Sequence, residues 1–474
     1  MKKNKILIFS FLLLSLAGCK KVIDVKETDF IGGDIALKTT ANNEQGIIGA
    51  YAGLTVDMGI LLNGVMSDEL RVADFYNSAT AHEWQYSSTD IVLRDNFTAF
   101  PLYYKVIDRA NRVLAALPNA TSTGAADDAL KLKLRGEALF LRAFAHFELY
   151  RFYSNSAVGT DLALAYLDAP SLAPQARITV APYMTKLKAD MAEAKTLVPN
   201  NLTDIARATK LAVSGLQARV ALYLKEYSDA VTYTTEYIAG LPLASKANFP
   251  GIWTDAVKDE IAFKLIRTTA TARLGSLYRG TSASSANIGT ITWRPSDKLW
   301  NSYDQVNDVR FASYLKNEPL LPSNRSSTKL IYKYAGTTYG TASENVADQK
   351  VFRTGEMYLI RAEAKAEGGD LAGAATDLNT LRAARINGYV NATFADKNAV
   401  INAIMDERFK ELAFEGHRFW DLKRRNLPVS RDAADAPNAA ATSLPAGNFR
   451  FLLPIPNSEI QANPLIQQNP GYTN

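Results

Sequence analysis

Aromatic side chains gather in parts of this sequence that lack helical periodicity, near position 85 and again between 241 and 350. Flat rings pack well against the C–H faces of sugars, and neighbouring carboxylates and guanidinium groups form paired hydrogen bonds with hydroxyls. The candidate ligand-binding residues are Asp68, Arg71, Trp84, Tyr86, Trp253, Tyr278, Trp293 and Arg294. The alternative for each ring is packing, because aromatic side chains are most often buried.

The sequence contains no recognisable catalytic motif. Its three histidines form neither HExxH nor another metal-ligand spacing, and no G-x-S-x-G, P-loop, Rossmann or EF-hand pattern is present. A glycosidase dyad is defined by geometry and not by spacing, so Asp68, Glu69 and Asp74 stay candidates, with a solvated loop as the better interpretation. We expect no catalytic residue, no metal site and no cofactor.

Cys19, the only cysteine, follows what we interpret as an export signal. Three lysines precede an apolar run over 6–16 that is too short to span a bilayer. Leu16-Ala17-Gly18-Cys19 then resembles a bacterial lipobox. We expect removal of residues 1–18 and a diacylglyceryl group on Cys19, which gives the chain more than one acyl anchor. The alternative is an ordinary secretory signal with an incidental cysteine.

The composition is that of an ordinary globular protein, with 47% hydrophobic and 21% charged residues in 474 positions. It excludes wholesale disorder and coiled-coil or collagen architecture. One cysteine excludes a disulfide framework and any multi-cysteine metal site. Removal of residues 1–18 takes away three lysines, so the charge falls from +5 to 50 minus 48, or +2. This small charge does not suggest a nucleic-acid partner.

Amphipathic helices account for much of the remaining chain, because apolar residues recur at three-and-four spacing. The predicted helices cover 44–56, 96–117, 127–153, 183–197, 210–224, 228–239, 354–385 and 398–415, the last continuing into 416–424. Helical periodicity is lost between 241 and 350. Loop regions of this length are usually functional or disordered, and the aromatic content here argues against disorder.

Two helical hairpins match each other in sequence, since 215–230 aligns with 359–374. The aligned pairs are Ala218 with Ala362, Ala230 with Ala374, and Tyr227 with Leu371. Small residues let antiparallel helices cross closely, and the larger third pair fills the gap between them. The pattern resembles a tetratricopeptide-type repeat, although a generic hairpin explains either copy alone nearly as well.

Two C-terminal segments have distinctive sequences. The first reads Glu407-Arg-Phe-Lys-Glu-Leu-Ala-Phe-Glu415-Gly-His-Arg418-Phe-Trp420-Asp421-Leu-Lys-Arg424, and the second runs from Leu453-Pro-Ile-Pro456 to Asn469-Pro470-Gly471-Tyr472. Together they resemble hallmark segments of the SusD/RagB family of outer-membrane lipoproteins. Arg361-Ala-Glu363-Ala364, Asp377-Leu-Asn379, the 137–147 segment and the lipobox also fit. The resemblance spans nearly the whole chain and is weakest over 241–350.

The resemblance implies a mostly α-helical, SusD-like α–α superhelix. Tetratricopeptide-like repeats would form the scaffold, and a loop-rich face would carry the ligand site. The expected parts are the signal peptide 1–18, a tether over 19–45, a helical-repeat region over 46–240, a loop-rich aromatic region over 241–350 and a C-terminal region over 351–474. Because the N-terminal loop region commonly contributes to the ligand face in this family, Trp84 is the first candidate.

The resemblance also implies a ligand and a partner. The ligand would be an oligosaccharide or, in one branch of the family, a peptide. The partner would be a SusC-type TonB-dependent transporter barrel, with this chain lipid-anchored in the outer membrane at the cell surface. A non-catalytic scaffold for surface protein complexes and a glycoside hydrolase are alternatives from other classes.

Trp420 receives a structural interpretation. Glu415, Arg418 and Asp421 are spaced three apart, so a helix would place them on one face, where they could form intrahelical or interhelical ion pairs. Because the resemblance here concerns the fold, the sequence predicts that this segment holds the structure together. The terminal Asn469-Pro470-Gly471-Tyr472 segment is likewise predicted to dock the tail.

Overall fold

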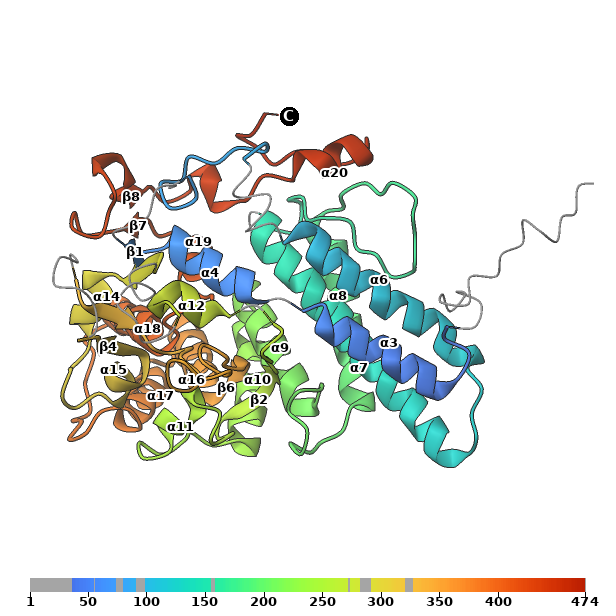
Figure 1. Ribbon diagram of the computed structural model, residues 1–474, viewed down its shortest axis with the longest axis horizontal. Coiled ribbons are helices and arrows are strands. Elements are labelled where there is room, and N and C mark those ends of the chain that lie inside the picture. The colour runs from blue at the N-terminus through green and yellow to red at the C-terminus, as the bar shows by residue number, and fades with distance from the viewer. Residues whose placement is uncertain are drawn as a thin grey trace, which may run out of the picture.

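Helices supply most of the regular structure in the computed structural model, which describes residues 36–54, 56–73, 80–90, 99–154, 158–271, 273–281, 291–319 and 327–473. The strands within these ranges are short and pair in twos (Figure 1). The mostly α-helical fold class is therefore confirmed. None of the helices in these ranges combines the length and apolarity needed to cross a bilayer. Cys19, the signal peptide and most of the tether lie outside the described residues.

The N-terminal part packs helices side by side (Figure 1). They are α3 (Thr40–Ala52), α6 (Phe100–Ala116), α7 (Ala125–Tyr153) and α8 (Val180–Leu197), whereas α4 (Val56–Met66) lies apart from them against α19 (Arg418–Arg424). Because α7 packs between α6 and α8, every residue from Gly136 to Tyr153 is buried.

Two N-terminal helices differ from their predicted extents. α3 begins four residues before the predicted 44–56, where the Thr39 side chain accepts a hydrogen bond from the Asn42 backbone N–H (3.1 Å) and caps the helix. The patterns did not predict α4 as a helix of its own. Its sequence is apolar on nearly all sides and so has no amphipathic period to detect.

Two helical hairpins stack on one another at the centre of the chain. The first is α9 (Lys210–Tyr223) with α10 (Tyr227–Gly240), and the second is α16 (Thr354–Glu367) with α17 (Leu371–Ala383). α10 packs against α16, so the hairpins share a continuous interface. The small residues that the sequence alignment paired are fully buried: Ala218, Ala230, Ala362 and Ala374.

Residues 241–350 form short elements instead of one long loop. The helices are α11 (Phe249–Trp253), α12 (Leu274–Arg279), α14 (Asp297–Ser302) and α15 (Val309–Tyr314), and the strands are β2 (Ile261–Leu265), β3 (Trp293–Pro295), β4 (Leu315–Asn317) and β5 (Lys329–Ile331). All pairings are antiparallel: β3 with β1 (Leu70–Val72), β2 with β6 (Gln349–Arg353), and β4 with β5. Elements of three to six residues carry too few periods to be read from sequence.

The C-terminal part begins with α18 (Lys397–Glu411) and α19 (Arg418–Arg424). Beyond them lie β7 (Val429–Ser430), its partner β8 (Ser443–Leu444), a 3-10 helix over Phe449–Phe451 and α20 (Asn457–Ala462). The tail runs along the upper edge of the molecule in Figure 1. It is docked there, since the Tyr472 hydroxyl donates to the Leu452 carbonyl (2.7 Å) and Asn469 Nδ2 donates to the Leu453 carbonyl (2.8 Å).

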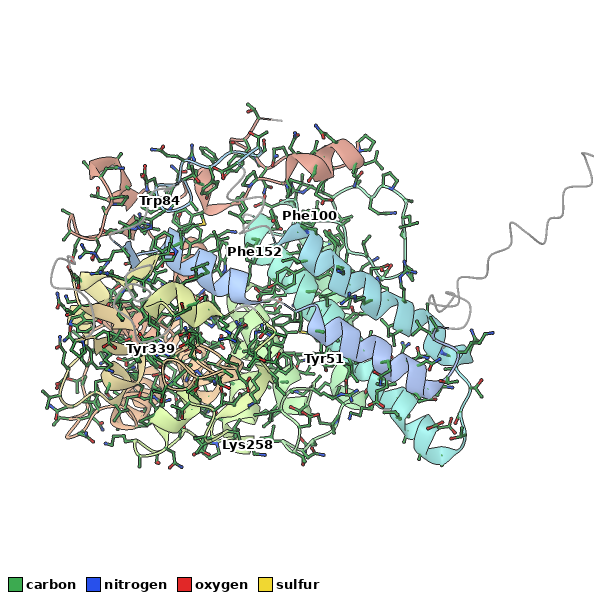
Figure 2. The ribbon with its side chains drawn as sticks, in the orientation of Figure 1. Tyr51, Trp84, Phe100, Phe152, Lys258 and Tyr339 are labelled. Atoms are coloured by element: carbon green, nitrogen blue, oxygen red, sulfur yellow. The ribbon has the colours of Figure 1, made fainter. Side chains whose placement is uncertain are left out.

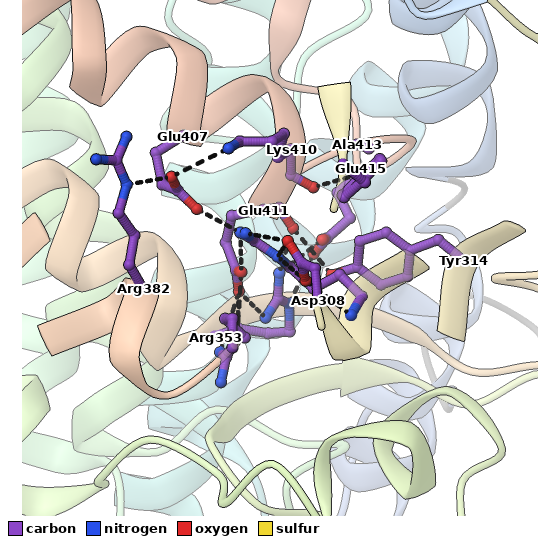
Figure 3. A network of polar contacts seen from close by, with 12 residues as sticks. Asp308, Tyr314, Arg353, Arg382, Glu407, Lys410, Glu411, Ala413 and Glu415 are labelled. Carbon is purple, nitrogen blue, oxygen red and sulfur yellow. Dashed lines mark hydrogen bonds and ion pairs between the residues drawn. The ribbon is translucent and has the colours of Figure 1, made fainter. Parts of the chain in front are cut away.

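A buried network of charged side chains joins α18 to its surroundings (Figure 3). Glu411 forms ion pairs with Arg310 (3.1 Å), Arg353 (3.0 Å) and Arg385 (3.1 Å). Glu407, one helical turn earlier, pairs with Arg310 at 2.6 Å. Burial alone would raise the pKa of Glu411, but the three guanidinium groups outweigh it and hold the pKa well below its ordinary value. The network therefore stays ionised in the interior.

Glu411→Ala should lower the free energy of unfolding by about 3–5 kcal/mol, because it leaves buried guanidinium groups without their shared carboxylate. Urea denaturation at neutral pH measures the change. The difference from wild type should narrow as pH falls below about 4.5, the ordinary pKa of the group. A depressed folded-state pKa gives stability that is present above the unfolded pKa and is lost on acidification.

The matched control is Asp108→Ala, which removes the exposed partner of Arg112. It should cost less than about 1 kcal/mol. If Glu411→Ala costs no more than this control, the network does not have the role assigned to it.

Candidate functional site

The β1–β3 pair brings several predicted ligand-binding residues together. Arg71 lies opposite Arg294 in the antiparallel register, and Val72 lies opposite Trp293. The His82 ring meets the Trp293 ring edge-on, with 5.3 Å between centroids. Sequence spacing alone could not predict this meeting, because the two strands are far apart in the chain.

Trp84 belongs to the same neighbourhood, at the upper left of the molecule in Figure 2, and is buried. Its ring is 3% exposed, and its indole N–H donates to the Met66 carbonyl (2.9 Å). The Arg431 guanidinium lies 4.1 Å from the ring centroid and also donates to the Ser67 carbonyl (2.9 Å). Both the ring and the polar atom of Trp84 are therefore occupied by the protein itself.

Asp68 and Arg71 form ion pairs with other parts of the chain. Asp68 is buried, receives two hydrogen bonds from Arg418 (2.8 and 3.0 Å) and pairs with Lys298 (2.6 Å). Burial opposes ionisation, but these positive charges prevail and hold the pKa of Asp68 well below its usual range. Arg71 pairs with Asp297 at 2.7 Å and keeps 24% of its side chain exposed, the most of the predicted set.

Glu69 contrasts with Asp68 although the two are adjacent. Its side chain is buried, and one carboxylate oxygen accepts a hydrogen bond from the Phe414 backbone N–H (3.2 Å). Burial raises the pKa of Glu69 to about 8, and the nearby charge of Asp68 adds to the increase. At neutral pH this carboxyl is therefore mostly protonated, and it has no solvent access.

The other predicted aromatics each pack against different parts of the protein. Trp253 ends α11, where the Lys333 ammonium lies 4.1 Å from its ring centroid. Tyr278 lies in α12 and packs against the ring of Phe414 at 6.1 Å. Tyr86 donates a hydrogen bond to the Arg450 carbonyl and stacks on Tyr472 of the tail. Each of these three rings is therefore engaged by neighbours within the protein.

All five tryptophans of the sequence are at most 4% exposed. Tyr86, Tyr278 and Arg294 are buried to a similar degree. None of these rings presents an open face to a sugar in the described structure. Ligand contact through them stays a prediction, and it requires their present neighbours to move.

The histidines are not arranged for acid–base chemistry. His82, His146 and His417 are buried, and burial lowers the pKa of His82 and of His146 to about 3. His146 packs between the rings of Tyr166 and Tyr183 and accepts or donates a hydrogen bond at the Tyr183 hydroxyl (3.0 Å). Within the described ranges, no group of three His, Cys, Asp or Glu side chains could hold a metal ion.

The charged residues around Trp420 pair with distant elements. Glu415 binds Arg353 (2.7 Å), Arg418 binds Asp68 (2.8 Å), and Asp421 binds Arg408 (2.7 Å). The three residues do form ion pairs, but they do not share one helical face. The helix predicted to continue from 398–415 into 416–424 is interrupted by a turn between α18 and α19, where Phe414 (φ 62°) and Gly416 (φ 82°) have positive φ. The pairs link this segment to β6, to the residues before β1 and to α18.

A cavity of about 290 Å³ lies beside Trp420. Its walls come from the ends of α7, α9 and α19 and from 447–451, and include Tyr150, Arg151, Tyr223, Trp420, Lys423 and Phe451. None of the predicted ligand-binding residues lines it. Sequence reasoning missed these residues because each belongs to a helix or turn that the patterns assign to the scaffold, and only the fold brings them together.

Trp84→Ala should lower the free energy of unfolding by about 3–5 kcal/mol, because a buried ring is replaced by a cavity. Chemical denaturation measures the loss, and Trp84→Phe, which keeps most of the ring volume, should cost clearly less. Unchanged stability together with weakened glycan binding would instead identify Trp84 as a ligand-stacking residue.

Comparison with known proteins places both halves of the chain in related families. The SusD family model matches residues 292–472. A model described as starch-binding associating with outer membrane matches residues 33–222. SusD-like protein P38 of Formosa agariphila is 24% identical, and the alignment covers 100% of each chain.

Solved structures share the fold over most of the chain. A SusD superfamily protein from Bacteroides thetaiotaomicron superposes with a TM-score of 0.79 at 23% identity, covering 91% of this chain and 100% of the other. A laminarin-binding SusD-like protein superposes with a TM-score of 0.72 at 19% identity, covering 92% and 100%. From the two matched regions and the shared fold, this chain belongs to the SusD/RagB family.

Proposed function

We propose that this chain is a nutrient-binding lipoprotein of the outer membrane, exposed at the cell surface, which captures an oligosaccharide and passes it to a SusC-type TonB-dependent transporter. The observation that carries the proposal is the match of both halves of the chain to SusD-type models, at residues 33–222 and 292–472. The shared fold with a laminarin-binding protein supports a glycan as the ligand class.

The lipid anchor in this proposal rests on the N-terminal sequence. Leu16-Ala17-Gly18-Cys19 follows a basic and then an apolar segment, which is the order that a lipoprotein signal requires. Two or more acyl chains hold a protein stably at a membrane, whereas one chain alone binds reversibly. An anchored binding protein would stay next to its transporter and present each captured ligand at a high effective concentration.

Binding without catalysis fits the polar chemistry of the described residues. A glycosidase needs two accessible carboxyl groups on either side of a sugar bond. Asp68 is buried in ion pairs with Arg418 and Lys298, and Glu69 is buried and mostly neutral. The histidines are covered as well. Asp74, the third carboxylate named from the sequence, lies outside the described residues. On the described residues we assign this chain no catalytic role.

Peptide capture is the second candidate. One observation favours it: all five tryptophans are buried, so the described surface lacks the row of stacked rings that a sugar groove uses. A peptide groove depends more on backbone and polar side-chain hydrogen bonds. The fold and the transporter partner are the same in both candidates.

A glycan panel that includes laminarin and starch oligosaccharides, measured by isothermal titration beside a mixed peptide panel, separates the two candidates. We expect at least one glycan to bind with a Kd of about 1 μM to 1 mM, and no release of reducing ends on incubation. Binding of peptides with no binding of any glycan would replace the sugar by a peptide, and release of reducing ends would refute the non-catalytic assignment.

Cys19→Ala should release the protein from the membrane fraction, because the acyl chains attach at this thiol and supply most of the membrane affinity. Fractionation followed by immunoblotting measures the distribution, and the melting temperature of the released protein should equal that of wild type. Ser10→Ala, which alters the apolar run but keeps the lipobox, is the matched control. Persistent membrane attachment of Cys19→Ala would contradict the anchor.

A further inference from the structure

The cavity beside Trp420 is formed where three helices end. α7 ends at Tyr153, α9 at Tyr223 and α19 at Arg424, and the turn over 447–451 closes the fourth side. Its volume of about 290 Å³ is near the lower limit of small-molecule pockets. Divided by the ~30 Å³ that one water occupies in the liquid, it has room for about ten waters, which suits a ligand the size of a single sugar ring.

The charge around this cavity is positive. Arg151, Lys225, Lys423 and Arg424 line it, and none of the described lining residues is Asp or Glu. Arg151 forms an ion pair with Glu148 (3.3 Å), and Arg424 forms one with Glu363 (2.6 Å). Neither glutamate lines the cavity.

The two lysines have no carboxylate partner among the described residues. Lys423 donates to the Arg151 and Ser154 carbonyls (2.8 and 2.6 Å), at the end of α7. Burial and the neighbouring charge of Arg151 lower the pKa of Lys423 to about 7. Lys225 is exposed at the rim. An anion bound beside these lysines would favour the charged form of Lys423 and would balance the charge of Lys225.

Polar atoms in the wall lack hydrogen-bond partners. Trp420 Nε1, the Tyr223 hydroxyl and Ser154 Oγ are all buried and all unpartnered. A buried donor without an acceptor is costly, so such groups usually meet a water or a ligand. Burial raises the pKa of Tyr223 to about 12, so its hydroxyl keeps its proton at neutral pH and can donate. These unpartnered groups therefore favour a ligand that carries several oxygen acceptors.

Aromatic side chains complete the lining. Tyr150, Tyr223 and Phe451 contribute rings to the same cavity. Rings beside hydroxyl and indole donors suit a compact ligand that has C–H faces as well as oxygens. A simple inorganic anion would use the charge and leave the rings without contact, and an aliphatic ligand would leave the polar atoms unsatisfied.

We propose that this cavity binds a single hexuronate unit, a sugar ring that carries one carboxylate. The carboxylate would lie toward Lys225 and Lys423, and the ring hydroxyls would accept hydrogen bonds from Tyr223 and Trp420. This site is separate from the residues around β1–β3 and does not depend on what binds there. It adds recognition of an acidic sugar to the proposed capture of oligosaccharides.

Isothermal titration of the full-length protein in detergent tests the site with sodium glucuronate, glucose and sodium acetate. We expect glucuronate to bind at least tenfold more tightly than either glucose or acetate. Tyr223→Phe removes only the unpartnered hydroxyl and should weaken glucuronate binding about tenfold. Lys225→Gln should weaken it about two- to fivefold, as expected of an exposed charge. The charge control is Lys258→Gln, a lysine that does not line the cavity and should have no effect.

Leu427→Trp provides a blocking variant, because Leu427 lines the cavity and is 37% exposed. It should abolish glucuronate binding while the melting temperature and the response to the neutral glycan panel stay unchanged. Glucose binding as tight as glucuronate, or acetate binding as tight, would overturn the acidic-sugar assignment. Glucuronate binding that survives Leu427→Trp would overturn the location. Failure of the neutral glycan panel alone would bear on the proposed function and leave this site intact.

Discussion

The position of α18 depends on keeping several charges ionised in a dry interior. Glu407 and Glu411 lie one turn apart on this helix and face Arg310, Arg353 and Arg385, which come from three separate parts of the chain. Removing such charges from water is expensive, and only close pairing on every side offsets the cost. The network therefore tolerates little displacement. It ties α15, the end of β6 and Arg385, two residues beyond α17, to one helix.

The segment after α18 extends the same constraint to the N-terminal half. Phe414 has a positive φ of 62°, and its backbone N–H donates to Glu69. Arg418 then reaches Asp68. These contacts place the start of β1 against the C-terminal part, and β1 in turn holds β3. The described helices of the region over 241–350 are short. Contacts with the two ends of the chain therefore largely hold this region in place.

The predictable parts of the fold are those whose information is local. The α9–α10 and α16–α17 hairpins could be located within a few residues, because each helix repeats its apolar spacing over several turns. α4 was not predicted as a helix, because its residues are apolar on nearly every side and show no amphipathic period. The strands were not predicted, because each is only two to five residues long and several pair with a strand far away in the sequence.

The type of a residue says less about whether it binds a ligand than the hydrogen-bond partners of its polar atoms do. Trp84 was the first candidate by type and region, yet its indole N–H already donates to Met66 and its ring is covered by Arg431. Trp420 was assigned to the scaffold, and its ion-paired neighbours support that role. Its own indole N–H is nevertheless unpartnered, beside a cavity whose lining is basic. A residue can thus hold the fold through its ring and its neighbours while its one polar atom is left without a hydrogen-bond partner. A single sequence does not show which polar atoms have hydrogen-bond partners. It does not show the cavity either, because the cavity forms only where the ends of three helices meet.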